Sequence, residues 1–291
     1  MKMGKYLILR KDLSDGLTSG NDFCDTNEYY NVSYNNPFLR IVRKMDFASI
    51  IGLFLGKWKH ELERYDVIIM FDNGYCKTLA KYIRRRNPKC RIILWFWNVI
   101  FEENEKYLSD GVVDEVWSYS WHDCEKYHLK HNTQFYSIDK TVRKNDLRWD
   151  LVFLGMDKGR GDYLKMIGED MRDVGVKAKI VMPKNKEEYM KYDEYLDMVS
   201  KSKGILDAVN ADNSGLTLRC MEALFFGKKL VTNNLDITGC DFYNSENVFI
   251  LGKDDINGLK SFIDSPFKKV SKGIIEYYDF NNWLRRFEEE K

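Results

Sequence analysis

The chain has 291 residues, of which 44% are hydrophobic and 31% are charged, and its formal net charge at pH 7 is +1. This length is enough for two domains of ordinary size, and the balanced charge gives no global reason to expect a nucleic-acid-binding protein. The six cysteines include no CxxC pair, which favours a reducing compartment over a disulfide framework. No apolar run approaches the roughly 20 residues of a membrane span, and the chain opens without a secretory signal. We therefore expect a cytoplasmic protein.

The first half of the chain alternates between predicted strands and helices. Apolar runs predict strands at residues 5–9, 66–71, 91–97, 112–119 and 133–137. Helices are expected at residues 37–58, 77–86 and 121–129. The run at 66–71 is continuously apolar after its first residue, which is typical of a parallel strand covered on both faces. Residues 10–25 form a polar loop after the first strand, where ligand sites of α/β sheets occur; a plain surface loop is the alternative.

The helix expected at residues 37–58 has an apolar part at 47–55 that is followed by Lys57, Trp58 and Lys59. We interpret it as a helix that faces the core. The alternative is a face that rests on a membrane surface, since Trp and Lys suit that boundary.

Two clusters in the first half suggest functions that we do not adopt. The arginines at 84–86 end a predicted helix, where cations are ordinary partners of the helix dipole, so we do not expect a nucleic-acid site there. His122, Cys124, His128 and His131 would spread around a helix and not converge on one metal ion.

A charged segment at residues 140–148 separates the two halves, and we predict domains at residues 1–146 and 147–291. Strands are expected in the second half at residues 150–154, 177–182, 204–209, 230–232 and 248–251. Helices are expected there at residues 163–174, 189–202, 216–226, 256–263 and 278–289. This alternation predicts an α/β protein with two doubly wound, Rossmann-like domains.

The helix at 216–226 organises the second half, and Gly227 is expected to end it as a C-cap glycine. One face has the spacing of a buried surface and consists of Leu216, Cys220, Ala223 and Leu224. A second face consists of Gly215, Arg219 and Glu222, and we predict that it binds a ligand.

The start of this helix suits phosphate, because it offers free N–H groups and a partial positive charge. Ser214 and Thr217 add hydroxyl donors, and Gly215 permits close approach to the backbone. Glu222 lies about 10 Å further along, at roughly 1.5 Å per residue. An acid at that distance could accept hydrogen bonds from the ribose of a nucleotide.

The loop at residues 155–161 places Lys158 and Arg160 between glycines, directly after a predicted strand. The glycines permit close backbone approach, and the two cations match phosphate oxygens. The spacing is neither GxGxxG nor that of a P-loop. Together with the helix start at Ser214, the loop predicts a clamp for a diphosphate.

The sequence from the strand before this loop, through SGLTLRCMEALFFGKKLVTNN, to a terminal helix with Trp283 resembles the C-terminal half of nucleotide-sugar glycosyltransferases of the GT-B type. More narrowly, it resembles bacterial enzymes that build capsule or lipopolysaccharide glycans. The resemblance is best over residues 150–287 and only architectural before them. It implies two Rossmann-like domains that face a central cleft, with the helix at about 278–289 crossing back to the first domain.

The resemblance also implies roles for single residues. Glu222 matches the ribose-binding acid, and Lys158 and Arg160 match a basic pair at the diphosphate. The turn at the diphosphate is matched by Ser214, Gly215, Leu216 and Thr217. Met182 begins the loop that matches the one near the base. Ser214 stands where many retaining members carry a second Glu, so retention of configuration is left open.

The expected reaction is metal-independent sugar transfer from a nucleoside-diphosphate donor, with a UDP-sugar favoured, to a glycan or lipid-linked acceptor in bacterial surface polysaccharide synthesis. No DxD motif lies in a strand-end loop, and no cofactor is expected. An inverting enzyme needs a general base, for which Asp15 and Asp72 are the candidates. The expected location is the cytoplasm. The alternative location is the inner face of the membrane, which the first domain would contact peripherally. The alternatives are a catalytically inactive partner subunit and a nucleotide-sugar epimerase.

Overall fold

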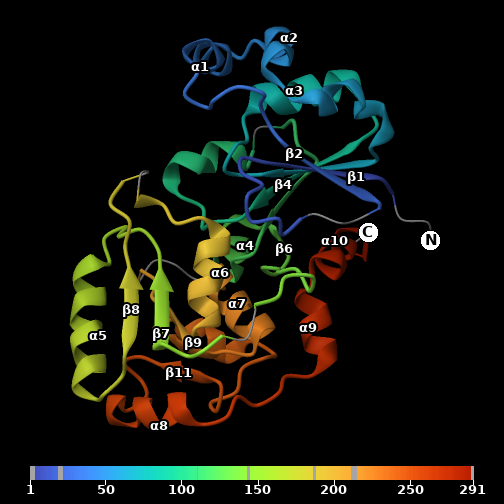
Figure 1. Cartoon of the computed structure of the whole chain (residues 1–291). Coiled ribbons are helices and arrows are strands. Elements are labelled where there is room, and N and C mark those ends of the chain that lie inside the picture. Colours follow the sequence, from blue (N-terminus) through green and yellow to red (C-terminus); the bar gives the residue numbers. More distant parts are fainter. Residues whose placement is uncertain are drawn as a thin grey trace. The chain divides into compact units, whose positions relative to one another are not determined.

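The structure, a computed structural model, describes residues 4–18, 22–109, 111–142, 145–185, 188–210 and 215–289. The chain divides into two compact units, residues 1–133 (unit 1) and residues 134–291 (unit 2). Figure 1 colours unit 1 from blue to green and unit 2 from green to red. Each unit contains one parallel β-sheet, so the predicted α/β class is confirmed.

The sheet of unit 1 has six parallel strands in the order β2-β1-β3-β4-β5-β6. The strands are β1 (Tyr6–Arg10), β2 (Cys24–Glu28), β3 (Val67–Phe71), β4 (Arg91–Phe96), β5 (Glu115–Ser118) and β6 (Lys130–His131). The α-helices are α1 (Pro37–Lys44), α2 (Ala48–Ile51), α3 (Lys77–Arg86) and α4 (Trp121–Tyr127). Short 3₁₀ helices are η1 (Gly52–Phe54), η2 (Lys57–His60), η3 (Leu62–Arg64) and η4 (Glu102–Tyr107). Every residue of β1 and β3 is buried, as expected for central parallel strands.

Three expectations for this half of the chain are wrong. The helix predicted at residues 37–58 is broken into α1, α2, η1 and η2, because Asp46 adopts a left-handed conformation at φ 55° and turns the chain after α1. The loop predicted at residues 10–25 ends early, since β2 begins at Cys24. No strand forms at residues 133–137, where Tyr136 makes only an isolated bridge to Asp279.

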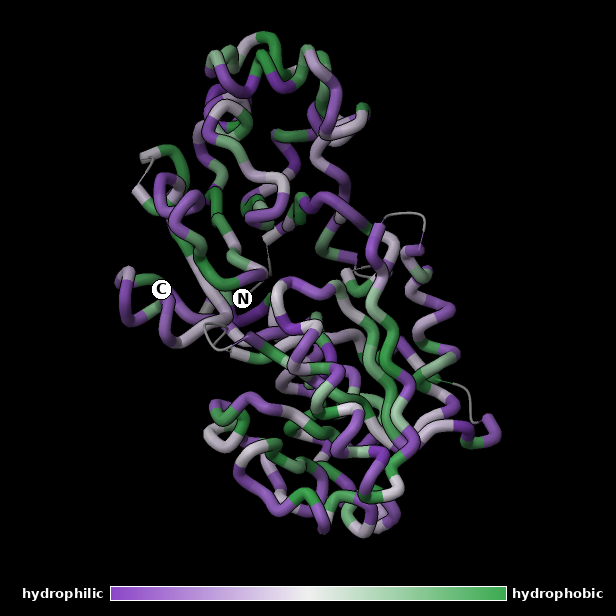
Figure 2. Tube along the Cα trace, turned by 90° about the vertical axis from the view of Figure 1, so that its left-hand side faces the viewer, coloured by the Kyte–Doolittle hydropathy of each residue, from purple (hydrophilic) through white to green (hydrophobic). Residues whose placement is uncertain are grey.

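The sheet of unit 2 has five parallel strands in the order β11-β10-β9-β7-β8. The strands are β7 (Trp149–Leu154), β8 (Ala178–Val181), β9 (Ser202–Asp207), β10 (Lys229–Thr232) and β11 (Val248–Ile250). The helices are α5 (Gly161–Asp173), α6 (Tyr192–Ser200), α7 (Leu218–Phe226), α8 (Leu259–Asp264), α9 (Lys272–Tyr278) and α10 (Phe280–Glu289). The hydropathy colouring of Figure 2 shows the apolar character of the strands in this sheet.

The elements of unit 2 follow the predicted order. Helix α7 ends as expected, because Gly227 adopts the left-handed conformation at φ 61° and its N–H bonds back to the last turn. The predicted terminal helix is present as α10, and the short α9 before it was not predicted.

The division between the units lies before the predicted boundary at 146/147, because the segment after Thr133 pairs with the last helices of unit 2. Tyr136 N donates to Tyr278 O at 3.0 Å, and Phe280 N donates to Tyr136 O at 2.8 Å. Ile138 N donates to the carboxylate of Asp279 at 2.9 Å. This segment therefore belongs to unit 2.

Within the described ranges, no helix is both long enough and apolar enough to cross a bilayer.

Gly204 in β9 lies where the sheet has no room for a side chain. A Cβ atom there would lie 2.6 Å from Lys229 O and 2.9 Å from a methyl carbon of Leu151. We expect Gly204→Ala to lower the free energy of unfolding by about 1–3 kcal/mol through overpacking, measured by urea denaturation. Gly273→Ala is the control, because its added Cβ meets nothing within 4 Å. Equal denaturation midpoints for Gly204→Ala and the native chain would contradict this packing.

Candidate anion-binding site

A buried carboxylate at the carboxyl end of β9 ties the start of α7 to the sheet. Asp207 is 0% exposed. Its Oδ1 accepts hydrogen bonds from Thr217 Oγ1 at 2.8 Å and Arg219 Nε at 2.9 Å. Its Oδ2 accepts from Thr232 Oγ1 on β10 at 3.0 Å. The arrangement satisfies a buried charge with one cation and two hydroxyls.

Thr217, at the N-cap of α7, donates its hydroxyl to Asp207 and does not cap the helix with its side chain. Gly215, just before the helix, adopts a φ of 104°, a conformation that favours glycine. Its carbonyl is held by Asn234 Nδ2 at 2.8 Å. Among the residues that the structure describes, the side chain at the N-cap therefore leaves the first-turn N–H groups of this nine-residue helix uncapped, and such N–H groups can bind anions.

Two guanidinium groups lie against one ring at this edge of the sheet. The guanidinium carbons of Arg160 and Arg219 lie 5.1 and 5.0 Å from the centroid of Phe153. Arg219 is ion-paired with Asp207. Arg160 instead donates to backbone carbonyls, to Met156 O at 3.0 and 3.2 Å and to Ala208 O. Burial, reinforced by the charge of Arg219, lowers the pKa of Arg160 to about 10.

Among the described residues, Arg160 forms no ion pair within 4.0 Å. Asp207 and Asp157 attract its charge from beyond that distance and Arg219 repels it, so an incoming anion in direct contact would stabilise it. The edge formed by Arg160, the start of α7 and the ends of β7 and β9 is thus the candidate anion site.

The glycine-rich loop before α5 differs from the expected phosphate cradle. Asp157 Oδ1 already accepts the N–H groups of Gly159 at 3.1 Å and Gly161 at 2.7 Å. Lys158 is exposed, adopts φ 48°, and its carbonyl accepts from Asn210 Nδ2 at 2.8 Å. The carboxylate of Asp157 therefore accepts the backbone N–H groups that were expected to bind phosphate. The loop can still offer an anion the cationic side chains of Lys158 and Arg160.

Glu222 does not lie on an accessible face of α7, contrary to the sequence pattern. Its side chain is 1% exposed, and its two oxygens accept from Tyr192 Oη at 2.8 Å and Tyr195 Oη at 2.6 Å. Tyr192 Oη also lies 2.6 Å from Tyr136 Oη. Burial raises the pKa of Glu222 to about 7. In this arrangement Glu222 meets protein hydroxyls, so a contact with ribose is not part of the site described here.

Three other residues were predicted to bind the nucleotide-sugar donor. Ser214 lies outside the described residues. Leu216 is half-buried beside Gly215 at the start of α7, while Met182 follows β8 and packs against the apolar core of unit 2.

The predicted bases lie at the carboxyl edge of the sheet in unit 1. Both carboxylate oxygens of Asp15 accept from the guanidinium of Arg10, at 2.6 and 3.0 Å, and Arg10 packs over the rings of Phe71 and Trp97. Asp72 follows β3, and its Oδ1 accepts from Trp97 N at 3.0 Å. Burial raises the pKa of Asp72 to about 6. Asp15 is thus an ion-pair partner, whereas Asp72 is a buried acid with a raised pKa.

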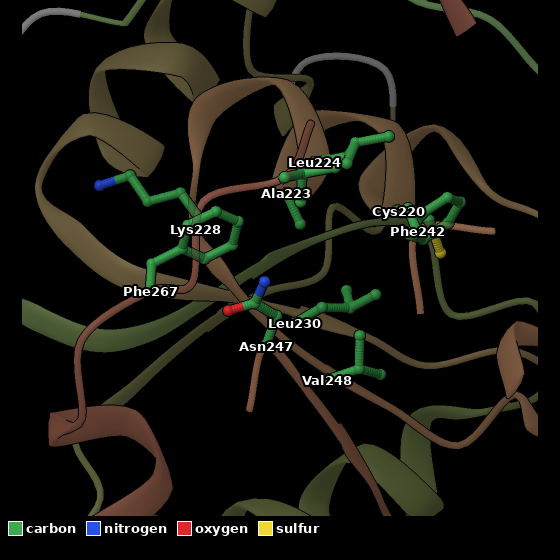
Figure 3. A pocket seen from close by; sticks show the side chains of 10 residues that line it. Cys220, Ala223, Leu224, Lys228, Leu230, Phe242, Asn247, Val248 and Phe267 are labelled. Carbon is green, nitrogen blue, oxygen red and sulfur yellow. The ribbon is translucent and has the colours of Figure 1, made fainter. Parts of the chain in front are cut away.

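A small cavity of unit 2 lies against the core-facing side of α7 (Figure 3). Cys220, Ala223 and Leu224 line it from the helix, as the predicted buried face requires. Phe242 and Phe267 close it from later in the chain. Its volume of about 20 Å³ has room for about one water molecule and not for a nucleotide.

Among the residues that the structure describes, no group of three or more His, Cys, Asp or Glu side chains is placed to hold a metal ion. The Cys124 thiol, one of the four side chains considered from sequence, lies near the carbonyls of Ser118 and Lys130.

Comparisons with models of protein families and with curated protein sequences find no match. Among solved structures, the chain is similar to a crystal structure of TarM, with a TM-score of 0.48 and 13% sequence identity. The similarity covers 77% of this chain and 54% of the TarM chain, so this chain spans about half the length of that structure. A similarity of this size identifies neither family nor activity, and the function is therefore inferred from the residues of the site.

Sequence reasoning missed Asp207, Asn234 and the two tyrosines that hold Glu222. Asp207 had a detectable signal, since it is an acid at the end of an otherwise apolar strand. Tyr192 and Tyr195 stand three residues apart on a predicted helix, but nothing in their spacing indicates which acid they contact.

The raised pKa of Glu222 predicts a pH-dependent stability. Between its ordinary value of 4.5 and about 7 the folded chain binds more protons than the unfolded chain, so this carboxyl lowers stability as the pH rises. We expect Glu222→Gln to gain about 2–3 kcal/mol in free energy of unfolding, relative to the native chain, between pH 5 and pH 8. Urea denaturation at both pH values measures it.

The matched control is Glu169→Gln on the exposed surface of α5, which should show no such change. A pH-independent difference between Glu222→Gln and the native chain would show that Glu222 does not titrate in this range.

Proposed function

We propose that this chain is a glycosyltransferase whose unit 2 binds the diphosphate of a nucleotide sugar at the carboxyl edge of its sheet. The observation that carries the proposal is the Arg160 guanidinium. It is half-buried, it donates to carbonyl oxygens of the described residues Met156 and Ala208, and it lies beside Arg219 at the end of β7. The carboxyl edge of a parallel sheet is where α/β proteins bind nucleotides.

The chemistry of sugar transfer fits this charge. When the sugar leaves, negative charge builds on the departing phosphate, and guanidinium groups and helix N–H groups stabilise such charge. Arg160 would contact the diphosphate directly. Arg219 acts mainly by repelling Arg160, since its own charge is matched by Asp207. Lys158, exposed on the same loop, would supply a second cation.

The rest of the proposal concerns the whole chain: its domain arrangement, its substrates and its location. We propose a GT-B arrangement, in which unit 2 binds the donor and unit 1 binds a glycan or lipid-linked acceptor of bacterial surface polysaccharides such as capsule or lipopolysaccharide. UDP-sugars are the favoured donors, metal-independent transfer is the favoured chemistry, and the cytoplasmic face of the membrane is the favoured location.

If the enzyme inverts configuration, Asp72 is the better candidate for the general base. A base works best when its pKa lies near the working pH, and burial raises the pKa of Asp72 to about 6. Asp15 is less suited, because both of its oxygens are engaged by Arg10.

The leading alternative is a binding subunit that keeps the fold without catalysis. The ion pair at Asp15 favours it, since one of two candidate bases is committed to structure. Release of sugar from a nucleotide sugar by the purified chain would separate the two. A nucleotide-sugar epimerase is a weaker alternative, because unit 2 contains no histidine.

We expect Arg160→Gln to weaken nucleoside-diphosphate binding by about tenfold or more, because a charge-assisted contact with phosphate is lost. The base is first identified by thermal shifts with UDP, GDP, ADP and CMP, and affinity is then measured by calorimetry. Arg172→Gln, an exposed change near the other end of α5, is the matched control and should bind as the native chain does. Unchanged affinity in Arg160→Gln would remove the site assignment.

We expect Asp72→Asn to slow sugar transfer by roughly a hundredfold, the usual contribution of a general base, with unchanged nucleotide affinity. The rate of the native chain should rise as the pH passes about 6, where Asp72 loses its proton, and the variant should lose this rise. A native rate and pH profile in the variant would exclude Asp72 as the base.

A further inference from the structure

Unit 1 exposes several large apolar side chains on α1, α2, η1 and the turn between α1 and α2. Leu53 is 72% exposed and Phe38 is 68% exposed. The other members are Ile41, Met45, Phe47 and Ile50. We call these six side chains the α1–η1 face. The six lie within sixteen positions of the chain, so they are not scattered singly over the surface. Concentrations of exposed apolar side chains mark interaction sites.

The outward direction of these side chains is fixed by the fold. Asn36 caps α1 by accepting the N–H groups of Phe38 and Leu39, and Pro37 fits the first helical position. Leu39 and Val42 then point into the core. The left-handed turn at Asp46 restarts the chain, after which Ala48, Ile51 and Leu55 are buried. The core of unit 1 is satisfied by these inward residues, so the outward ones have no role in it.

The surroundings of the α1–η1 face are strongly basic. Residues 37–60 contain five cations, Arg40, Arg43, Lys44, Lys57 and Lys59, against the single acid Asp46. That acid is already occupied, since its carboxylate accepts from Thr78 Oγ1 at 2.9 Å and from Lys81.

A cavity of about 790 Å³ opens beside the α1–η1 face. Its lining has five cations, against the one acid Asp46 that Thr78 and Lys81 already engage. The cations are Arg40, Arg43 and Lys44 of α1, Lys77 at the start of α3 and Lys106 of η4. Helix α3 has ten residues, and Cys76 gives it no side-chain cap, so the positive end of the helix dipole adds to these cations. The cavity therefore suits a phosphate group.

We propose that the α1–η1 face docks on an anionic phospholipid bilayer, with its apolar side chains in the interface and a lipid phosphate in the neighbouring basic cavity. Short amphipathic helices that bear Phe, Leu and Ile on one side and Lys or Arg around them bind membranes in this way. The anionic surface potential of the bilayer attracts the cations, and burial of the apolar side chains holds the protein there. Trp58 takes no part, because it is 3% exposed and its Nε1 donates to Glu28 O.

Two other partners fit less well. A nucleic acid would engage the cations but would leave Phe38, Ile41 and Leu53 in water. A second copy of this chain would cover the apolar side chains, but a symmetric contact would bring the same basic rim against itself. An anionic bilayer matches both features at once.

The test is co-sedimentation of the full chain with vesicles of phosphatidylcholine alone or mixed equally with phosphatidylglycerol. No nucleotide or sugar is needed, so the result does not depend on the proposed function. We expect binding to the anionic vesicles that is about tenfold stronger than to the neutral ones and weaker at high salt. The triple variant Phe38→Ser, Ile41→Ser, Leu53→Ser and the double variant Arg40→Gln, Lys44→Gln should each lose most of it.

Matched controls change equally exposed residues of unit 2. They are Leu147→Ser, Met166→Ser and Leu235→Ser for the apolar set, and Lys253→Gln with Lys269→Gln for the charged set. Both should bind vesicles as the native chain does, and circular dichroism checks that every variant is folded. Absence of vesicle binding by the native chain overturns the proposal, as does equal loss in the controls. Binding to an oligonucleotide or self-association, without vesicle binding, overturns it in favour of those partners.

Discussion

The buried carboxylate of Asp207 determines how charge is distributed at the edge of the sheet in unit 2. A carboxylate at 0% exposure is stable only if its charge is matched and its oxygens are satisfied. Arg219 supplies the charge, and the hydroxyls of Thr217 and Thr232 supply the remaining hydrogen bonds. Two consequences follow within the described part of the chain: Thr217 gives the start of α7 no side-chain cap, and Arg160, the other arginine over Phe153, forms no ion pair within 4.0 Å. Asp207 and Asp157 attract Arg160 from beyond ion-pair distance, so its charge is less closely matched than that of Arg219.

Glu222 shows what happens to a buried acid without an ion pair. It is one turn along the same helix from Arg219, yet its direct partners are the neutral hydroxyls of Tyr192 and Tyr195. Burial therefore outweighs the hydrogen bonds and raises its pKa to about 7. The hydrogen bonds of Glu222 join α6 to α7. Its burial destabilises the fold only when the pH is high enough to ionise the carboxyl group.

In unit 1, the candidate catalytic acids and the exposed apolar side chains lie on different elements. At the carboxyl edge of its sheet, Arg10 and Asp15 neutralise each other over the rings of Phe71 and Trp97, and Asp72 is left as the acid with a raised pKa. On α1, α2 and η1 the chain instead presents apolar side chains and cations together. The net charge of +1 for the whole chain hides this local excess, because acids elsewhere balance it.

The sequence by itself determined the class of fold, because continuous apolar strands such as β3 must be covered on both faces and the βα alternation then requires parallel sheets. It also determined local events that depend on one residue, such as the end of α7 at Gly227, where only the left-handed conformation is compatible with the turn.

The sequence could not place partners that are distant along the chain. Periodicity put Gly215, Arg219 and Glu222 on one helix face, but β9 and α6 decide what that face meets, so Arg219 turns to Asp207 and Glu222 is buried under two tyrosines. The same reason explains why the helix expected at residues 37–58 is wrong. The sequence showed the apolar content of this segment, but the turn at Asp46 depends on contacts with Thr78 and Lys81 of α3. That turn also decides which side chains point inward and which point outward. Local pattern sets which elements form, and only tertiary packing decides which side chains are matched, buried or left exposed.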